Sequence, residues 1–341
     1  MNVLLIQLKR IGDLILTTPA IAALRQTFPE AKITLIISRE CQEMVPAIQG
    51  VDKILVMKPG VAAAKVLAPI ARAKFDWCID FTRNDRSAFI TLLSRARKRV
   101  VSFRIKVRSK MRSRAYNEFV QHRMRDMHTI DYHLALLEPL GISNASPEIQ
   151  LSLPASAQAN AVELLRKHKV EMPFIVFHPG SARAEKFWNP SQWADVIEHT
   201  RVNHRVDLIL TGGPGDAEQQ HLAQIKSKVR PPIVDLSGKT DLLTLAALLG
   251  RARLLVTVDS APMHLAAATK TPQVILFGPT NPFHWRPRES RALVLQGGST
   301  LPITEFAPKQ VRLPMNQIST QGVIDAIESV LSSPAEEPPL S

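Results

Sequence analysis

Residues 253–268, RLLVTVDSAPMHLAAA, run from a strand through a polar turn into a helix. After Arg253, the mostly apolar and partly β-branched residues up to 258 predict a buried strand, and the alanine-rich residues 265–268 favour a helix. Ser260 suits the N-cap of that helix and Pro262 suits its first turn. Such a turn offers free backbone N–H groups and the positive end of a helix dipole, which together favour bound phosphate. An ordinary turn whose polar residues only cap the helix is the alternative.

Strands alternate with helices along the rest of the chain, which predicts βαβ units around parallel sheets. The expected strands are residues 3–7, 33–37, 53–56, 77–81, 174–177, 207–210, 254–258 and 273–277. The expected helices include residues 21–24, 87–93, 128–140, 192–201, 217–227, 242–249 and 262–269. Polar turns follow four of these strands, and ligands of open α/β sheets bind at such strand ends. These turns are residues 9–13, 178–186, 211–218 and 259–264.

The chain of 341 residues exceeds one comfortable hydrophobic core, so two domains are expected. The residues before and after a Ser-, Ala- and Pro-rich linker at 143–157 repeat the same pattern. We therefore predict two similar α/β domains, residues 1–150 and 158–331, with a cleft between them. Residues 332–341 are rich in Pro and Glu, which predicts a disordered tail.

The net charge of +13 is unevenly placed. Residues 1–150 contain 24 Lys and Arg against 13 Asp and Glu, a net of +11, whereas the rest of the chain has a net of only +2. Residues 95–114 contain ten basic residues and no acidic one. This charge predicts an anionic partner such as a phosphorylated glycan, a nucleic acid or a membrane surface. A solvated basic surface is the alternative reading.

The sequence indicates a cytoplasmic protein. No apolar run approaches the roughly 20 residues of a membrane span, and no signal peptide is apparent. Cys41 and Cys78 form neither a disulfide framework nor a metal cluster, so both are expected to be buried thiols.

Five motifs occur in order along the chain. They are Arg10-Ile11-Gly12-Asp13 followed by residues 16–20, His178-Pro179-Gly180-Ser181 with residues 186–188, residues 236–240, residues 259–264 and Phe277-Gly278-Pro279-Thr280. Together they resemble glycosyltransferase family nine, the bacterial lipopolysaccharide heptosyltransferases. Residues 80–82, 86–90 and 95–114 look most like the branch that adds the third heptose. Many members have Gly where this chain has Ala261, and that methyl group crowds the approach of a phosphate.

This resemblance implies an α/β fold of the GT-B type, in which two Rossmann-like domains face each other across a central cleft. It implies transfer of a heptose from ADP-heptose to a hydroxyl of the phosphorylated lipopolysaccharide inner core, with inversion at the sugar carbon. The first domain would bind the acceptor and the second the ADP-sugar. No metal or cofactor is expected. The enzyme would lie peripherally at the cytoplasmic face of the inner membrane.

Asp13 matches the base of the family, with an N-cap on the following helix as its alternative role. The resemblance assigns donor contacts to Ser181, Lys186, Glu218, Thr240, Asp259, Ser260, Ala261 and His264. Lys186 would neutralise the diphosphate, and Glu218 would hold the ribose, with Asp216 as its competitor. Candidate acceptor contacts are Arg83, Arg86, Arg104 and Arg108, because guanidinium groups pair well with phosphates.

The sequence also bears on three other functions. A dehydrogenase is disfavoured because residues 212–215, Gly-Gly-Pro-Gly, lack the spacing of a dinucleotide fingerprint. A nucleic-acid-binding protein is disfavoured because the chain has two tyrosines, and neither tyrosine nor tryptophan occurs in residues 95–114. The same fold acting on a protein or on another surface glycan stays open.

Overall fold

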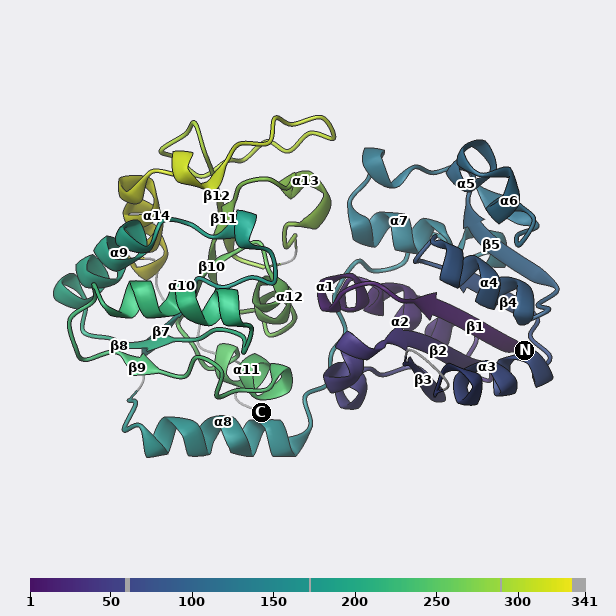
Figure 1. The fold of residues 1–341 in the computed structure, drawn as a ribbon, viewed down its shortest axis with the longest axis horizontal. Coiled ribbons are helices and arrows are strands. Elements are labelled where there is room, and N and C mark those ends of the chain that lie inside the picture. Colours follow the sequence, from purple (N-terminus) through teal and green to yellow (C-terminus); the bar gives the residue numbers. More distant parts are fainter. Residues whose placement is uncertain (59–61, 172, 289, 333–341) are drawn as a thin grey trace. The chain divides into compact units, whose positions relative to one another are not determined.

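The computed structural model describes residues 1–58, 62–171, 173–288 and 290–332 (Figure 1). The chain divides into two compact units, Met1–Ser152 and the residues from Leu153 onward. Each unit has its own sheet and its own core. The prediction of two α/β domains is confirmed. Among the described residues, no helix has both the length and the apolar character needed to cross a bilayer.

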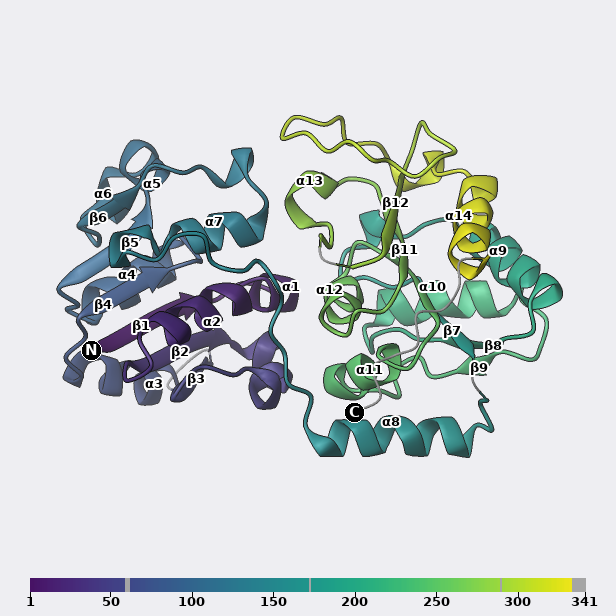
Figure 2. The same cartoon turned by 180° about the vertical axis from the view of Figure 1, so that it is seen from behind.

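The first unit is a parallel sheet of six strands in the order β3-β2-β1-β4-β5-β6. The strands are β1 (Asn2–Gln7), β2 (Lys32–Ser38), β3 (Lys53–Met57), β4 (Trp77–Asp80), β5 (Lys98–Ser102) and β6 (Glu118–Val120). The helices are α1 (Ile11–Ile15), α2 (Thr18–Thr27), α3 (Ala62–Arg72), α4 (Asp85–Leu93), α5 (Arg104–Arg108), α6 (Lys110–Ser113) and α7 (Thr129–Ala135). Helices cover both faces of this sheet (Figures 1 and 2).

The apolar run of β1 reflects this double cover. Leu4 and Ile6 pack with Ile70 of α3 and Ile90 of α4, while α2 and α7 pack against each other. A strand that is buried on both faces has no polar side to alternate with its apolar side. This explains why residues 3–6 are all apolar and all buried.

The second unit repeats the architecture with strands in the order β12-β11-β10-β7-β8-β9. The strands are β7 (Phe174–His178), β8 (Asp207–Leu210), β9 (Val234–Asp235), β10 (Leu254–Val258), β11 (Gln273–Phe277) and β12 (Ala292–Gln296). The helices are α8 (Ala155–Lys167), α9 (Pro190–Asn203), α10 (Asp216–Lys226), α11 (Leu242–Leu249), α12 (Ala261–Ala268), α13 (Pro282–Trp285) and α14 (Thr320–Ser332).

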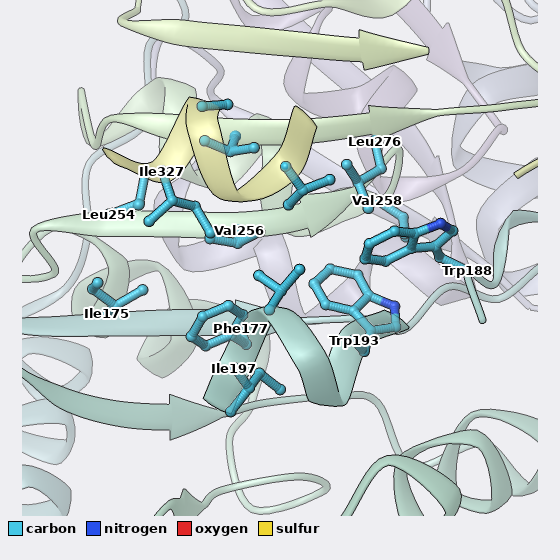
Figure 3. Close-up of a cluster of buried hydrophobic side chains, with 14 of the residues drawn as sticks. Ile175, Phe177, Trp188, Trp193, Ile197, Leu254, Val256, Val258, Leu276 and Ile327 are labelled. Carbon is cyan, nitrogen blue, oxygen red and sulfur yellow. The ribbon is translucent and has the colours of Figure 1, made fainter. Parts of the chain in front are cut away.

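The main core of this unit lies between the sheet and helices α9, α10 and α14 (Figure 3). Trp188 and Trp193 meet edge to face with ring centroids 5.3 Å apart, and both are fully buried. On the other face, Met263 of α12 packs against Ile275 and Phe277 of β11. Alternate residues of β11 thus pack against the helices on opposite faces of the sheet.

Both sheets have the same strand order when the strands are counted within their own unit, namely 3-2-1-4-5-6. This is the order of the Rossmann fold, and ligands bind where the order reverses. The reversal falls between β1 and β4 in the first unit and between β7 and β10 in the second.

Several boundaries differ from the predictions. The helix expected over 128–140 is interrupted, because α7 ends at Ala135 and Pro139 lies in a separate 3₁₀ turn, Glu138–Leu140. Proline has no N–H to donate to the carbonyl four residues earlier. The predicted linker is partly helical, since α8 begins at Ala155. Strands β5, β6, β9 and β12 were not predicted.

The disordered tail was predicted to begin at residue 332, and this boundary is wrong. Ser332 still belongs to α14, because the buried apolar side of that helix continues to Leu331. The rest of the tail, residues 333–341, lies outside the described residues.

His133 of α7 is fully buried in the first unit. Its ring lies 5.1 Å from that of Phe81, and Nδ1 is 3.0 Å from the carbonyl oxygen of Leu16. Burial, together with the positive charge of Lys9, lowers the pKa of His133 to about 3. The native state therefore keeps this imidazole neutral at pH values where the unfolded chain would protonate it.

We predict that the free energy of unfolding of the first unit falls as the pH drops from about 6.5 toward 3. The unfolded state then binds a proton that native His133 does not bind, and the full loss is about 5 kcal/mol. The measurement is urea unfolding followed by circular dichroism across that pH range. His133→Gln should flatten the pH dependence, whereas His168→Gln, at the residue that follows α8, should not. An equally steep dependence in the His133→Gln variant would contradict this assignment.

Candidate functional site

Asp13 lies just beyond the carboxyl end of β1, at the reversal point of the first sheet. It is the third residue of α1, and its side chain is 12% exposed. Lys9 is four residues earlier, before α1 begins, and its Nζ lies 3.2 Å from Oδ1 of Asp13. The strand end thus presents a carboxylate paired with an ammonium group.

Helix capping does not explain Asp13. The N-cap of α1 is Arg10, and the N-cap of α2 is Thr17. The Asp13 carboxylate accepts a hydrogen bond from Nζ of Lys9. No backbone N–H group of the described residues donates to this carboxylate, so the alternative that Asp13 serves as an N-cap is wrong.

Asp80 organises the neighbouring strand end, at the carboxyl end of β4. Its Oδ1 accepts hydrogen bonds from the backbone N–H groups of Thr82 and Arg83, at 2.8 and 3.0 Å. Its Oδ2 accepts from the hydroxyls of Ser87 and Tyr116, at 2.6 and 2.5 Å. Burial raises the pKa of Asp80, and these four hydrogen bonds oppose that shift. They also hold the turn that carries Arg83 in a left-handed conformation with φ of 65°.

Arg83 is held on both sides. Its guanidinium lies 4.7 Å from the centroid of the Tyr132 ring, and Nη2 lies 2.8 Å from Sδ of Met124. Burial lowers the pKa of Lys9; Asp13 opposes this shift and the charge of Arg83 adds to it. Asp13 therefore lies beside Lys9, whose ammonium group is in turn near the positive charge of Arg83.

A pocket of about 870 Å³ opens beside this strand end. Its volume suits an oligosaccharide-sized ligand. Its lining is strongly charged and includes Arg86, one of the predicted acceptor residues. The lining residues are Leu8, Lys9, Arg10, Ser38, Arg39, Glu40, Gln42, Glu43, Met57 and Arg86.

The other predicted acceptor arginines gather elsewhere in the first unit. The pKa of Arg104 is lowered by burial and then by the charges of Arg108, Arg125, Arg83 and Arg123. Arg83, Arg104 and Arg108 therefore share one positive field, while Arg86 lines the pocket.

In the second unit, Lys186 and Asp259 meet at the reversal point between β7 and β10. Lys186 Nζ lies 2.6 Å from Oδ2 of Asp259 and 2.8 Å from its carbonyl oxygen. The Thr280 hydroxyl donates to the same carboxylate oxygen. Both charged side chains are largely buried, so each depends on its partner for stabilisation.

The N-terminus of α12 follows Asp259 directly. Ser260 occupies the N-cap as predicted, but its hydroxyl donates to the carbonyl of Val258 and does not cap the helix. Among the described residues, the backbone N–H groups of Ser260 and Ala261 have no recorded hydrogen-bond partner. Free N–H groups at this end of an eight-residue helix favour an anion.

The side chain of Glu218, on α10, contacts the glycine-rich turn that follows β8. It accepts a hydrogen bond from Gly213 N at 2.6 Å, and its Oε1 lies 3.6 Å from Nε2 of His178. A Cβ at Gly180 would fall 1.7 Å from Oε1 of Glu218, so only glycine permits this approach. Burial raises the pKa of Glu218 and lowers that of His178 to about 4. The competitor Asp216 is exposed at the start of α10.

The remaining predicted donor residues lie on the same unit. Ser181 is buried, and its Oγ accepts from Arg183 N at 3.3 Å. His264 is buried within α12. Thr240 is half-buried after the turn at Gly238, whose N–H donates to Gly212 O at 2.8 Å.

Sequence reasoning missed Lys9, Asp80, His178 and Thr280 as members of these two sites. Lys9 and Asp13 are four residues apart, a spacing that brings side chains together on a helix. Asp80 and His178 end their strands, and that position was a usable signal. Nothing in the sequence pairs Thr280 with Asp259. Among the described residues, no cluster of His, Cys, Asp or Glu is arranged to hold a metal ion.

The profile of glycosyltransferase family 9 (heptosyltransferase) matches residues 64–307, more than half of the chain. Lipopolysaccharide heptosyltransferase 3 of Escherichia coli is 26% identical over 336 residues, which cover 94% of this chain and 97% of that protein.

Among solved structures, a family 9 glycosyl transferase from Veillonella parvula has a TM-score of 0.82 at 25% identity, covering 97% of both chains. The E. coli ADP-heptose lps heptosyltransferase II has a TM-score of 0.73 at 21% identity, covering 97% of this chain and 98% of that one. This likeness in fold confirms the predicted α/β fold of the GT-B type. The chain belongs to glycosyltransferase family 9, the heptosyltransferase family.

Proposed function

We propose that this protein transfers a heptose from ADP-heptose to a hydroxyl of the lipopolysaccharide inner core, with inversion at the sugar carbon. Membership of family 9 supports the reaction class, and the name of the relative lipopolysaccharide heptosyltransferase 3 supports the acceptor class. The observation that carries the proposal is the pairing of Asp13 with Lys9 at the reversal point of the first sheet.

Asp13 acts as the base. As the acceptor oxygen bonds to the sugar carbon, the bond from that carbon to the diphosphate breaks and ADP leaves with the electron pair. The acceptor proton passes to the Asp13 carboxylate. A single inverting displacement needs no second carboxylate as nucleophile. Lys9 acts as a positioning residue, because its ammonium group fixes one oxygen of this carboxylate.

The second unit binds the donor. Lys186 and the free N–H groups of Ser260 and Ala261 stabilise the charge that develops on the departing diphosphate. Ser181, Asp259 and His264 complete the diphosphate and sugar contacts. Glu218 holds the ribose, since its burial beside the glycine turn distinguishes it from exposed Asp216. Thr240 contacts the adenine. Because protein groups supply this positive charge, the proposed reaction requires neither metal nor cofactor.

The first unit binds the acceptor. Arg86 meets it in the pocket beside β1, and Arg83, Arg104 and Arg108 bind phosphates of the core. Guanidinium groups suit this task because their paired N–H groups match phosphate oxygens. We place the enzyme in the cytoplasm, peripherally at the inner membrane, where a lipid-linked acceptor would be available. Residues 95–114, with ten basic residues and no acidic one, support an anionic partner.

We predict that Asp13→Asn lowers kcat by about 100-fold or more, because the amide keeps the shape of the side chain but cannot accept the proton. The KM for ADP-heptose should stay nearly unchanged. The measurement is mass spectrometry of a soluble, delipidated core oligosaccharide incubated with ADP-heptose.

The exposed Asp195 of α9 provides the matched control, and Asp195→Asn should keep full turnover. Lys9→Met should lower kcat by about tenfold, the effect of one charge-assisted contact, and Lys9→Arg should restore part of it. Substantial turnover in Asp13→Asn would remove Asp13 from the role of base. Absence of transfer by the wild type would overturn the proposed function itself.

We predict that Lys186→Ala weakens ADP binding by roughly 10- to 100-fold, the loss expected for a charge-assisted contact. Isothermal titration calorimetry with ADP measures this directly. Lys228→Ala, which changes an exposed lysine of the same unit, should bind ADP like the wild type.

Removing Lys186 also leaves Asp259 without its cation, which can destabilise the unit. Lys186→Arg therefore serves as a second variant that keeps the ion pair, and its ADP affinity should exceed that of Lys186→Ala. If all folded variants bind ADP equally well, Lys186 is not a phosphate ligand.

A further inference from the structure

Helices α5 and α6 expose large apolar side chains on the first unit. Val107 of α5 is 71% exposed and Met111 of α6 is 74% exposed, and Phe103, just before α5, is 36% exposed. The three residues follow one another at intervals of four. Isolated apolar residues on a surface are ordinary, but three within nine residues form a local concentration.

These apolar side chains stand among uncompensated basic ones. Within the described part of the chain, Lys106, Arg108, Lys110 and Arg114 are exposed and form no recorded ion pair. The lowered pKa of Arg104 reflects burial together with repulsion from four neighbouring arginines, so positive charge accumulates beside this segment. A surface that served only solubility would mix the two signs of charge and would not interleave them with apolar side chains.

Helix α4 extends the same surface. Arg112 of α6 forms an ion pair with Asp85 at the start of α4, which ties the two helices together. Phe89 and Leu92 of α4 are each 56% exposed. Figure 1 shows α4, α5 and α6 in one region of the first unit. We call these three helices the basic–apolar surface.

We propose that the basic–apolar surface docks on a bilayer that contains anionic phospholipid. Its charge is complementary to anionic headgroups, and Val107 and Met111 have the exposure needed to enter the boundary between headgroups and acyl chains. This inference rests on the peripheral membrane location in the proposed function and is independent of the transfer chemistry. It assigns a docking role to apolar side chains that contact neither the donor nor the acceptor in the proposed reaction.

The experiment is co-sedimentation of the full chain with vesicles of phosphatidylglycerol mixed with phosphatidylcholine, and with vesicles of phosphatidylcholine alone. Wild type should bind the anionic vesicles, and binding should weaken with salt because exposed charges are screened beyond about 8 Å at physiological ionic strength. Val107→Asp/Met111→Asp should lower vesicle affinity by at least about tenfold, because it removes apolar insertion. Lys110→Glu/Arg114→Glu should lower the vesicle affinity by at least about 25-fold, because each of the two lost basic residues contributes about fivefold.

Val202→Asp is the matched control, because Val202 of α9 is 69% exposed and lies on the other unit. Its vesicle binding should equal that of the wild type. Circular dichroism and heptose transfer to the delipidated oligosaccharide should both be unchanged in Val107→Asp/Met111→Asp, which separates docking from folding and catalysis. Vesicle binding by a wild type that transfers no heptose would overturn the proposed function and leave the docking surface in place.

Equal vesicle affinity of wild type and Val107→Asp/Met111→Asp would overturn the proposed docking surface. So would equal binding of the wild type to neutral and anionic vesicles. Binding of a DNA duplex in preference to anionic vesicles, unaffected by Val107→Asp/Met111→Asp, would also overturn it and assign the basic residues to nucleic acid.

Discussion

The reversal of strand order in each sheet is the constraint on which both proposed sites depend. Where β1 adjoins β4, and where β7 adjoins β10, the connections leave toward opposite sides of the sheet, so the strand ends remain open to a ligand. Asp13 and Lys9 occupy the first opening, and Lys186 and Asp259 occupy the second. The two ion pairs thus lie at equivalent positions of two similar folds. The proposed base is at the position in the first unit, and the proposed anion site is at the position in the second.

Each opening contains a partly or largely buried ion pair, and such pairs cost desolvation free energy that their mutual attraction only partly offsets. Their presence is better explained by function than by stability. Lys186 is bonded twice to Asp259, which holds its ammonium group beside the N-terminus of α12. The Asp80 network does the same for Arg83 by fixing the turn after β4 through four hydrogen bonds. Rigid placement of charge before the substrate arrives is what electrostatic stabilisation of a transition state needs.

The two units divide the charge of the molecule between them. Nearly all of the net charge belongs to residues 1–150, where ten basic residues in 95–114 have no acidic neighbour in sequence. Two acidic side chains of the same unit, Glu118 and Asp85, pair with Lys98 and Arg112 of this segment. The basic residues left without such partners stand beside Val107 and Met111, and that combination of charge and exposed apolar area distinguishes a bilayer from a purely ionic partner.

The sequence by itself determined the architecture. Strands that are buried on both faces have uninterrupted apolar sequences, and the polar turns follow these strands directly. It also placed Asp13, Lys186 and Asp259 in the polar segments that follow strands. It did not reveal β5 within the basic segment, because Lys98–Ser102 begins with two basic residues and contains only two apolar ones, Val100 and Val101. Tertiary structure alone paired Lys186 with Asp259 and Asp80 with Tyr116, since these partners are distant in sequence and meet only when parallel strands align. It also separated buried Glu218 from exposed Asp216, because Gly180 leaves room for one carboxylate to approach the turn.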